Sequence, residues 1–237
     1  MAAMDESYGS PPMRGVAQPS RAEALALPGV RVIAHPLIAH KLTMLRDRTT
    51  PPDRFATLTR ELGALMAYEA MADLELEAAP IETPLEPMTG ARIAGEVAIA
   101  PVLRAGLGMA EGFRQTLPEA RVTHIGLRRD ETTLRPVAYY QNLDHFQHNP
   151  QIRACFMLDP MLATGGSAID TLNLLKAHGA RGLRVVALIA APYGLVALRR
   201  AHPDVPIFVA AVDERLDERG YIVPGLGDAG DRQFNTL

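Results

Sequence analysis

The stretch that decides the fold is IRACFMLDPMLATGGSAIDTLNLLKAHG, residues 152–179. Its first seven residues form a short apolar run, which indicates a buried strand. After the small residues of the loop, Ile169, Leu172 and Leu175 recur at helical spacing and are expected to face inward. Gly179 is expected to end this helix. The sequence therefore predicts a strand, a glycine-containing loop and a helix in direct succession.

The same alternation continues along the chain. Before the strand at 152–158, the sequence predicts a helix whose inward face carries Phe55, Leu58, Leu62, Leu65 and Met66. Short apolar runs that alternate with helices are typical of a parallel sheet covered on both faces, so we expect an α/β fold. Further strands are expected over residues 96–103, 121–127, 183–191 and 206–213, and helices over residues 52–74, 106–118 and 193–202.

Composition limits the classes of function. The chain has 237 residues, 48% of them hydrophobic and 22% charged, which suits one globular domain with a sizeable core. A net charge of −3 provides no basic field for nucleic acid or for an anionic membrane. The longest apolar stretch, VVALIAAP, is far shorter than the roughly 20 residues of a membrane span. We therefore expect neither nucleic acid nor a membrane as a partner.

Two features bear on location and domain limits. Cys155 is the only cysteine and lies within an apolar run, so a disulfide framework is excluded and a cytoplasmic location is expected. Residues 1–28 mix Gly, Pro, Ser and Ala without clear periodicity and are expected to be a mostly flexible extension. Residues 29–237 are expected to form one domain.

The loop at the end of the strand 152–158 has the residues of an anion site. Gly165 and Gly166 allow the backbone to approach a ligand closely, while Thr164 and Ser167 contribute hydroxyl donors. The helix that follows points its N-terminal N–H groups toward the same place. A plain strand-to-helix turn, with glycine for geometry, is the alternative interpretation.

Asp159 qualifies the kind of anion. A carboxylate beside a phosphate site would repel the phosphate, but it can accept hydrogen bonds from the hydroxyls of a sugar attached to that phosphate. The pattern thus favours a ribose phosphate. The alternative is an acid that accepts hydrogen bonds from loop amides, as an N-cap residue does.

Arginines follow two other predicted strands. Arg104 lies between an apolar strand and a glycine-flanked helix start, and Arg128 and Arg129 come after the strand 121–127. A guanidinium group offers a planar fork of donors to anionic oxygens. Each arginine alone could be a solvated surface charge. Together with the loop they suggest a ligand with two separate phosphate groups.

At this point the chain resembles the uracil phosphoribosyltransferase family. The matching stretches are HPLIAHKLTMLRD, MAYEAMADLELE, APVLRAGLGMAEG, DPMLATGGSAIDTLNLLK and GYIVPGLGDAGDRQF, of which the last two are specific. They cover the chain from about residue 29 to its end. The resemblance implies the type I phosphoribosyltransferase fold: a mainly parallel sheet flanked by helices, a hood formed by N-terminal and C-terminal segments, and a β-hairpin arm at about residues 128–146.

The resemblance also implies the reaction and the residues that serve it. Uracil and 5-phosphoribosyl 1-diphosphate give UMP and diphosphate, with Mg²⁺ accompanying the diphosphate. Arg104, Arg129 and Asp228 match catalytic residues that engage the diphosphate, Asp228 together with the metal. The pyrophosphate loop around Arg104 often has a non-proline cis peptide in the family. The positions that match binders of 5-phosphoribosyl 1-diphosphate are Arg104, Arg129, Asp159, Pro160, Met161, Leu162, Ala163, Thr164, Gly165, Gly166, Ser167 and Asp228, and those that match binders of uracil are Ile222, Gly227, Asp228 and Ala229.

Base selection is expected from the backbone of the segment YIVPGLGDAGD. Uracil presents two carbonyl acceptors flanking an N–H donor, and backbone groups of a glycine-rich loop can match that edge. Cytosine would place an amino donor against an N–H, a mismatch that discriminates by roughly 10⁴ or more. A mobile C-terminus is the alternative, but the triplet at residues 221–223 reads as a strand.

Some positions depart from patterns in the wider superfamily. Pro160 and Ala163 stand where many phosphoribosyltransferases have acids, in agreement with the uracil enzymes. The loop is therefore expected to bind substrate, with proton removal elsewhere or to solvent. Asn142 stands where many relatives have an arm lysine, which puts that lysine's role in doubt here.

Two rival classes follow from the same fold. A nucleotide-binding regulator that also binds RNA would need a basic face, and a purine or orotate transferase would need a second acid in place of Pro160. The resemblance further implies a homo-oligomer, a dimer or a tetramer. It leaves open GTP as an allosteric effector, because GTP activates some relatives.

Overall fold

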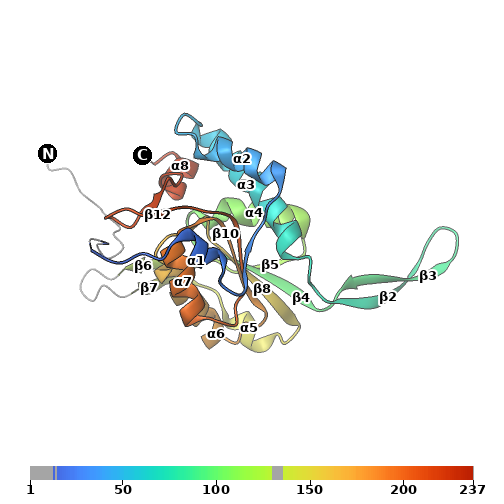
Figure 1. Cartoon of the computed structure of the whole chain (residues 1–237). Helices are drawn as coiled ribbons and strands as arrows, with labels where there is room; N and C mark the ends of the chain where they lie inside the picture. Colours follow the sequence, from blue (N-terminus) through green and yellow to red (C-terminus); the bar gives the residue numbers. More distant parts are fainter. Residues whose placement is uncertain (1–12, 14, 130–135, 237) are drawn as a thin grey trace.

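The computed structural model describes residue 13, residues 15–129 and residues 136–236. Its centre is a seven-stranded sheet in which every pairing is parallel (Figure 1). The prediction of a mainly parallel sheet is therefore confirmed. In spatial order the strands are β1 (Val30–Val32), β11 (Ile207–Val212), β10 (Leu183–Ala190), β8 (Ile152–Leu158), β4 (Glu96–Pro101) and β5 (Arg121–Val122), with β9 (Met161–Leu162) also paired to β10.

The sheet is buried on both faces. Along β8 the side chains of Ala154, Phe156 and Leu158 join one apolar cluster, and those of Cys155 and Met157 join the other. This alternation is the period of two that a strand imposes. The first cluster is completed chiefly by α2 (Pro36–Arg46), α3 (Pro52–Ala70) and α4 (Gly106–Thr116), and the second chiefly by α1 (Arg21–Leu25), α5 (Asp144–His148), α6 (Gly166–Ala177) and α7 (Pro192–Ala201).

Helix α6 ends as the sequence indicates. Gly179 follows the C-cap residue His178 and has a φ of +83°, a left-handed conformation that glycine adopts without a steric cost. The N–H of Ala180 donates to the Leu175 carbonyl at 3.0 Å, and the Gly179 N–H donates to the Lys176 carbonyl at 3.0 Å. This pair of hydrogen bonds is the Schellman motif, which stops the helix.

Helices α3 and α4 approach each other through glycines. A Cβ atom on Gly63 would lie 2.7 Å from the Met109 carbonyl oxygen, and one on Gly112 would lie 2.5 Å from the Ala64 nitrogen. Close backbone contact brings the inward face of α3 against the sheet. Of the five residues predicted on that face, four are at most 1% exposed, whereas Leu65 is only partly buried.

The prediction of one strand over residues 121–127 is wrong. The chain forms β5 in the central sheet and then leaves it at Thr123, whose hydroxyl donates to the Asn142 carbonyl at 2.5 Å. It continues as β6 (Ile125–Arg129), which pairs antiparallel with β7 (Pro136–Gln141). Arg128 and Arg129 therefore belong to a strand rather than following one. Apart from residues 125–127, the two strands of this hairpin fall within the predicted arm at about residues 128–146. The role of the hairpin as an arm remains a prediction.

A second hairpin has no counterpart in the sequence analysis. Strands β2 (Leu76–Glu82) and β3 (Pro87–Ile93) pair antiparallel over their full length and project from the body of the molecule (Figure 1). Most of its side chains are exposed, so burial produced no alternating apolar pattern from which strands could be predicted.

Helix α1 lies within the segment expected to be a flexible extension. Its N-cap is a capping box, in which Ser20 accepts from the Glu23 N–H and the Glu23 carboxylate accepts from the Ser20 N–H at 2.7 Å. Ala24 is fully buried against the second apolar cluster. Residues 1–12 and 14 lie outside the described residues, and the flexibility of the extension remains a prediction.

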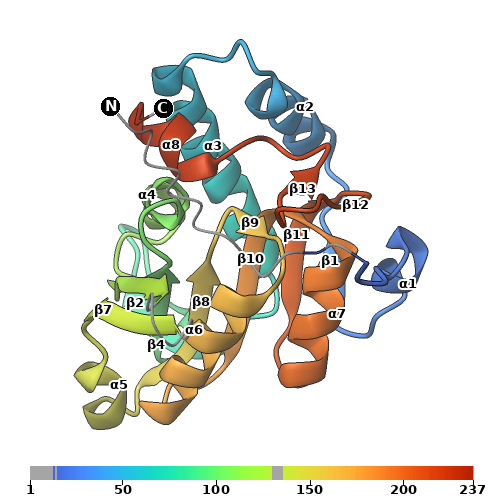
Figure 2. The same cartoon turned by 90° about the vertical axis from the view of Figure 1, so that its left-hand side faces the viewer.

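N-terminal and C-terminal segments meet beyond the carboxyl ends of the strands. Figure 2 shows α2, α8 (Ala229–Phe234), β12 (Arg215–Leu216) and β13 (Ile222–Val223) on this side of the sheet. Arg232 of α8 donates to the carbonyls of Leu45 at 2.9 Å and Asp47 at 2.5 Å, and its guanidinium carbon lies 4.5 Å from the centre of the Phe55 ring. These contacts join the two segments that the sequence analysis predicts as a hood.

The described parts of the chain contain no helix that is both long enough and apolar enough to cross a bilayer.

We expect Gly112→Ala to destabilise the protein by about 1–3 kcal/mol, because the added methyl group meets backbone atoms that cannot move aside. Equilibrium unfolding in urea measures the loss. The matched control is Gly90→Ala in β3, where a Cβ atom would have no neighbour closer than 3.6 Å. Equal stabilities for the two variants would contradict the close packing of α3 on α4.

Candidate functional site

The backbone of β10 fixes the loop that follows β8. The Asp159 N–H donates to the Val186 carbonyl at 3.2 Å, and the Pro160 carbonyl accepts from Leu188 and Ile189 at 3.1 and 3.0 Å. The Leu162 carbonyl accepts from the Ala191 N–H at 2.9 Å. Met161 and Leu162 thus extend the sheet as β9, an element too short to be expected from the sequence. The loop reaches α6 with its path set by main-chain hydrogen bonds.

The first turn of helix α7 packs against the loop. Gly194 is in its first turn, and a Cβ atom there would lie 2.9 Å from the Leu162 carbonyl oxygen and closer still to that of Ala163. Gly165 has a φ of +85°, and its own Cβ atom would lie 3.0 Å from the Gly194 carbonyl oxygen. The loop therefore lies directly on the backbone of α7. The left-handed conformation accounts for glycine at position 165, as the alternative interpretation of a turn with glycine for geometry supposed.

The start of α6 presents hydrogen-bond donors. Gly165 is the N-cap residue and has no side chain to accept from the first turn, so the early N–H groups of the helix remain available to a ligand. Ser167 is exposed and Thr164 is partly buried, which leaves both near the surface of the loop. A Cβ atom on Gly166 would meet only the Thr164 hydroxyl, at 3.8 Å. The geometry is that of an anion site at a helix N-terminus.

Asp159 stands at the carboxyl end of β8 and is partly buried. Burial raises the pKa of Asp159 to about 6, and the hydrogen bond from the Met161 N–H, at 3.2 Å, acts in the opposite direction. The side chain accepts from this loop amide, as the alternative interpretation supposed. The remaining acceptor capacity of the carboxylate is compatible with sugar hydroxyls.

Arg104 lies at the end of β4 and contacts the C-terminal helix. The peptide bond between Leu103 and Arg104 is cis, which is the feature that the resemblance implies for this loop. The Arg104 guanidinium lies 3.1 Å from a carboxylate oxygen of Asp231 and 5.9 Å from the centre of the Phe234 ring. Its side chain is 53% exposed, so the pair with Asp231 is a weak surface interaction that a stronger anion can replace.

Arg129 is the last residue of β6, and its backbone is paired with Pro136. Its side chain lies outside what the structure describes, as does that of Arg128. The part of Arg129 in the site therefore remains a prediction.

The predicted uracil segment runs from β13 into α8. Ile222 and Ala229 are buried, whereas Gly227 is exposed and has a φ of +80°. Asp228 is the N-cap residue of α8 and accepts from the Asp231 N–H at 2.9 Å. Among the described residues, no acceptor is found for the Gly227 N–H. The structure thus places an available main-chain donor beside the carboxylate predicted to engage the diphosphate.

Asp228 provides a carboxylate oxygen that could face Mg²⁺. One oxygen of Asp228 caps α8, which leaves the other for a metal. The described residues contain no cluster of three or more His, Cys, Asp or Glu side chains that could hold a metal ion. Mg²⁺ is commonly bound through one or two carboxylates together with substrate phosphates, and Asp228 fits that arrangement.

Several residues of this region were missed in the sequence analysis. Arg46, Asp213, Asp231 and Arg232 make the ion pairs and hydrogen bonds that hold the C-terminal segment. One signal was present, because Asp213 ends an apolar strand as Asp159 does. The arginines could not be recognised, because their partners are distant in the sequence.

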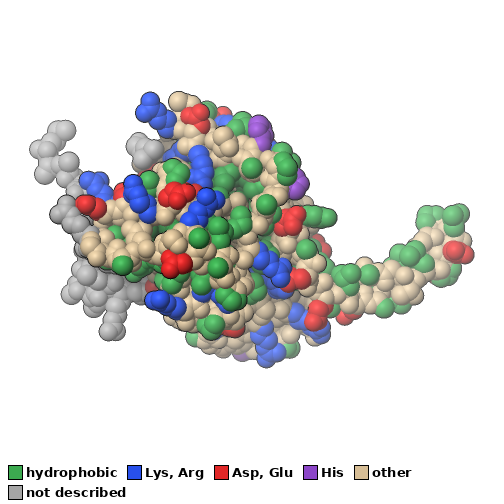
Figure 3. Space-filling view, in the orientation of Figure 1, with side chains coloured by type: hydrophobic (Ala, Val, Ile, Leu, Met, Phe, Trp, Pro, Cys, Tyr) green, Lys and Arg blue, Asp and Glu red, His purple; other side chains and the backbone are tan. Residues whose placement is uncertain are grey.

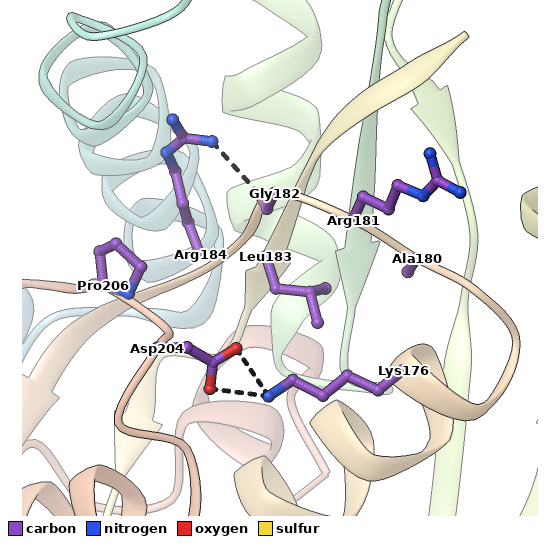
Figure 4. A pocket seen from close by; sticks show the side chains of 8 residues that line it. All are labelled: Lys176, Ala180, Arg181, Gly182, Leu183, Arg184, Asp204 and Pro206. Carbon is purple, nitrogen blue, oxygen red and sulfur yellow. Dashed lines mark hydrogen bonds and ion pairs between the residues drawn. The ribbon is translucent and has the colours of Figure 1, made fainter. Parts of the chain in front are cut away.

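Two surface cavities lie away from these residues. One, of about 290 Å³, is at the start of β10 and is lined by Lys176, Arg184 and Asp204 among others. Figure 4 shows Lys176 reaching Asp204 there, with nitrogen to oxygen distances of 2.8 and 2.9 Å. The other, of about 530 Å³, lies between α2, α3 and the end of α4. None of the predicted site residues lines either cavity.

Comparison with known proteins gives close relatives. The chain is 51% identical over 208 residues to the uracil phosphoribosyltransferase of Macrococcus caseolyticus, which covers 87% of this chain and 98% of the relative. It is 51% identical over 207 residues to the uracil phosphoribosyltransferase of Roseiflexus sp. strain RS-1, with the same coverage.

Solved structures agree on the fold. The AQ2163 protein from Aquifex aeolicus has a TM-score of 0.80 at 37% identity, covering 86% of this chain and 97% of that one. The adenine phosphoribosyl transferase of Trypanosoma brucei has a TM-score of 0.50 at 12% identity, covering 79% and 85%, a likeness that concerns the fold alone. The family model for uracil phosphoribosyltransferase matches residues 32–236. The chain therefore belongs to the uracil phosphoribosyltransferase family and has the type I phosphoribosyltransferase fold.

Proposed function

We propose that the loop of residues 159–167 holds the ribose 5-phosphate end of 5-phosphoribosyl 1-diphosphate while the enzyme carries out the reaction of its family. In that reaction uracil and 5-phosphoribosyl 1-diphosphate give UMP and diphosphate, a pentosyl transfer that salvages the pyrimidine. The observation that carries the proposal is the uncapped start of α6, where N–H groups are available beside Gly166. The helix dipole adds to the attraction for a phosphate.

The diphosphate is the leaving group, and it carries more negative charge as the bond to the anomeric carbon breaks. Arg104 and Arg129 would stabilise that charge with their guanidinium groups. Mg²⁺, carried by the diphosphate and engaged by Asp228, would neutralise part of the same charge. Arg104 would exchange its weak pair with Asp231 for the diphosphate, and Asp159 would accept hydrogen bonds from the ribose hydroxyls.

Uracil would be read by main-chain groups of Ile222, Gly227 and Ala229, next to Asp228. The available N–H of Gly227 supports this assignment, because a carbonyl oxygen of uracil would give it an acceptor. A base with an amino group at that place would leave the donor unpaired. The uracil proton is expected to be removed by a group outside the phosphate loop or to leave to solvent.

Regulation and location are further proposals that rest mainly on the resemblance. GTP remains a candidate effector, and addition of GTP to the assay tests it. A cytoplasmic location suits an enzyme whose substrate and product are phosphorylated metabolites.

We also propose that the enzyme is a homo-oligomer assembled through the β2–β3 hairpin. Four apolar side chains on the hairpin are exposed: Leu76 at 66%, Ile81 at 49%, Leu85 at 95% and Met88 at 49%. Figure 3 shows hydrophobic side chains along this projection, far from the body. Apolar surface held away from its own core is characteristic of an interface with another chain.

Gly166→Ala tests the phosphate assignment. The added methyl group has room in the free protein but would stand where a phosphate approaches the helix start, so we expect binding of ribose 5-phosphate to weaken by at least about tenfold. Calorimetric titration measures the affinity, and thermal unfolding checks that the fold is kept. Unchanged ribose 5-phosphate affinity would remove this loop from the site, whereas a wild-type enzyme that makes no UMP would reject the reaction itself.

Asp159 makes binding depend on pH. Its pKa is raised to about 6 by burial, and the sugar hydroxyls would bind the ionised form, so we expect the KM for 5-phosphoribosyl 1-diphosphate to rise as the pH falls through 6. Asp159→Asn should raise this KM by about tenfold or more at pH 8 and flatten its dependence on pH.

The stability of the same variant is a control. The raised pKa means that the folded protein binds a proton more tightly at Asp159 than the unfolded chain does. The ionised carboxylate therefore destabilises the fold above pH 6, and this cost disappears as the pH falls toward 3.8. Asp159→Asn should consequently be at least as stable as the wild type at pH 8. If the KM for 5-phosphoribosyl 1-diphosphate changed with pH in the same way in the wild type and in Asp159→Asn, the role of Asp159 would be contradicted.

If the β2–β3 hairpin forms the interface, charged substitutions on it should lower the mass of the oligomer in solution. We expect the wild type to sediment as a dimer or tetramer at micromolar concentration, and Leu85→Asp combined with Met88→Asp to shift it toward the monomer, because two charges would be buried in the interface. Leu37→Asp, at a similarly exposed apolar residue on α2, is the control and should leave the mass unchanged. A monomeric wild type, or an unaltered mass for the hairpin variant, would be incompatible with the proposal.

A further inference from the structure

An ion pair between the buried Asp213 and the partly buried Arg46 lies beside the segment assigned to uracil. Asp213 follows β11 and is 5% exposed, and its N–H donates to the Ala190 carbonyl at the end of β10, at 2.8 Å. Arg46, the last residue of α2, binds the Asp213 carboxylate with both terminal nitrogens, at 2.8 and 2.5 Å. Such bidentate pairs have a defined geometry as well as a favourable energy.

The pair holds Gly225 through both of its main-chain hydrogen-bonding groups. The Gly225 N–H donates to Oδ2 of Asp213 at 2.9 Å, and the Gly225 carbonyl accepts from Nη1 of Arg46 at 2.7 Å. Gly225 is buried and has a φ of +67°, so another residue would be strained there. Both hydrogen-bonding groups of Gly225 are therefore satisfied by side chains from the two neighbouring segments.

The next residue is held in the same manner. Arg232 donates to the Leu226 carbonyl at 2.7 Å and to the Leu45 carbonyl at 2.9 Å. Gly225 and Leu226 stand directly before Gly227, whose N–H has no acceptor among the described residues. Two consecutive residues whose main-chain groups are held by side chains thus precede an available donor.

This arrangement matters because a base read by main-chain groups requires those groups to be fixed within about half an ångström. The segment contains two left-handed glycines and would be mobile if nothing held it. The buried charge of Asp213 and the partly buried charge of Arg46 are paired with each other and hydrogen-bonded to the segment, which offsets the cost of their burial.

We propose that Arg46 and Asp213 are positioning residues for uracil. They do not touch the base; they fix Gly225, and through it the main-chain groups at Gly227 and Ala229, in the conformation that accepts uracil. The inference rests on the proposed function of the segment 222–229. It assigns affinity and selectivity for the base to a pair of side chains outside the base site.

The experiment compares Arg46→Gln, Arg46→Lys and Asp213→Asn with the wild type in steady-state assays in which each substrate is varied separately. We expect Arg46→Gln and Asp213→Asn to raise the KM for uracil at least tenfold and the KM for 5-phosphoribosyl 1-diphosphate less than threefold. Affinity for ribose 5-phosphate should stay within twofold. The preference for uracil over cytosine in kcat/KM should fall.

Arg46→Lys keeps the charge and one donor, so its KM for uracil should lie between those of the wild type and Arg46→Gln. Combining Arg46→Gln with Asp213→Asn should add less than the sum of the single effects, because the two residues act as a unit. If Arg46→Gln does not fold, the lysine variant decides, with a rise in the KM for uracil of threefold or more expected.

Arg184→Gln is the matched control. Arg184 is 85% buried by side chain, donates to an Asp73 carboxylate at 3.1 Å and to the Gly182 carbonyl at 3.2 Å, and stacks on the Phe156 ring. Arg184 lies near the start of β10, whereas the candidate site lies at the carboxyl ends of the strands; Figure 4 shows its side chain at the cavity. The variant Arg184→Gln should lower the melting temperature of the protein without changing the KM for either substrate.

The outcomes separate the two levels of the argument. A wild-type enzyme that makes no UMP from uracil rejects the proposed function. An active wild type with Arg46 variants that change both KM values by the same factor, or neither, overturns the positioning role alone. Variants that only lose stability, as Arg184→Gln is expected to do, overturn it as well.

Discussion

The candidate site depends on the backbone of β10. This strand is central in the sheet. Beyond the end of β8, the N–H and C=O groups of β10 continue to pair with the loop, from Asp159 to Leu162. Met161 and Leu162 pack against the apolar clusters, whereas the small residues that follow, from Thr164 to Ser167, have little apolar surface to bury. Main-chain pairing therefore adds to the order of the loop, and it places the start of α6 at the carboxyl edge of the sheet, where ligands bind in such folds.

The charged side chains at this edge of the sheet make only weak ion pairs with one another. Arg104 pairs with Asp231 in a partly exposed position, and the Asp159 carboxylate has a raised pKa. Farther out, Arg46 pairs with the buried Asp213 and Arg232 donates to main-chain carbonyls, and both arginines are partly buried. The weakly paired groups are the ones assigned to substrate, and the strongly paired groups hold the segments on which they stand.

Much of the fold follows from local patterns. The apolar run of β8 and the helical spacing of α6 were readable because burial on two faces, or on one helical face, leaves a period in the sequence. The family resemblance then placed the reaction and the fold. The β2–β3 hairpin was not predictable, because its exposed strands contain prolines and show no alternation. The departure of the chain after Val122 was missed since it depends on Thr123 bonding to Asn142.

The candidate site divides in the same way. Gly165, with its left-handed backbone, and Asp159, at a strand end, could be singled out because a single residue type at one position has a physical meaning. The roles of Arg46 and Arg232 could not, because an arginine in a sequence does not reveal which distant carbonyl it meets. Contacts between residues more than 160 positions apart require the fold to be known.

The position of Cys155 has a practical consequence. It is the single cysteine of the chain, and it lies in the middle of β8 with no exposed surface. Burial raises the pKa of its thiol to about 12, so the reactive thiolate is scarce near neutral pH. Maleimide and iodoacetamide reagents are therefore expected to react with Cys155 very slowly in the folded protein. A cysteine introduced on the surface can carry a spin label or fluorophore in the otherwise unaltered chain, without first replacing the native thiol.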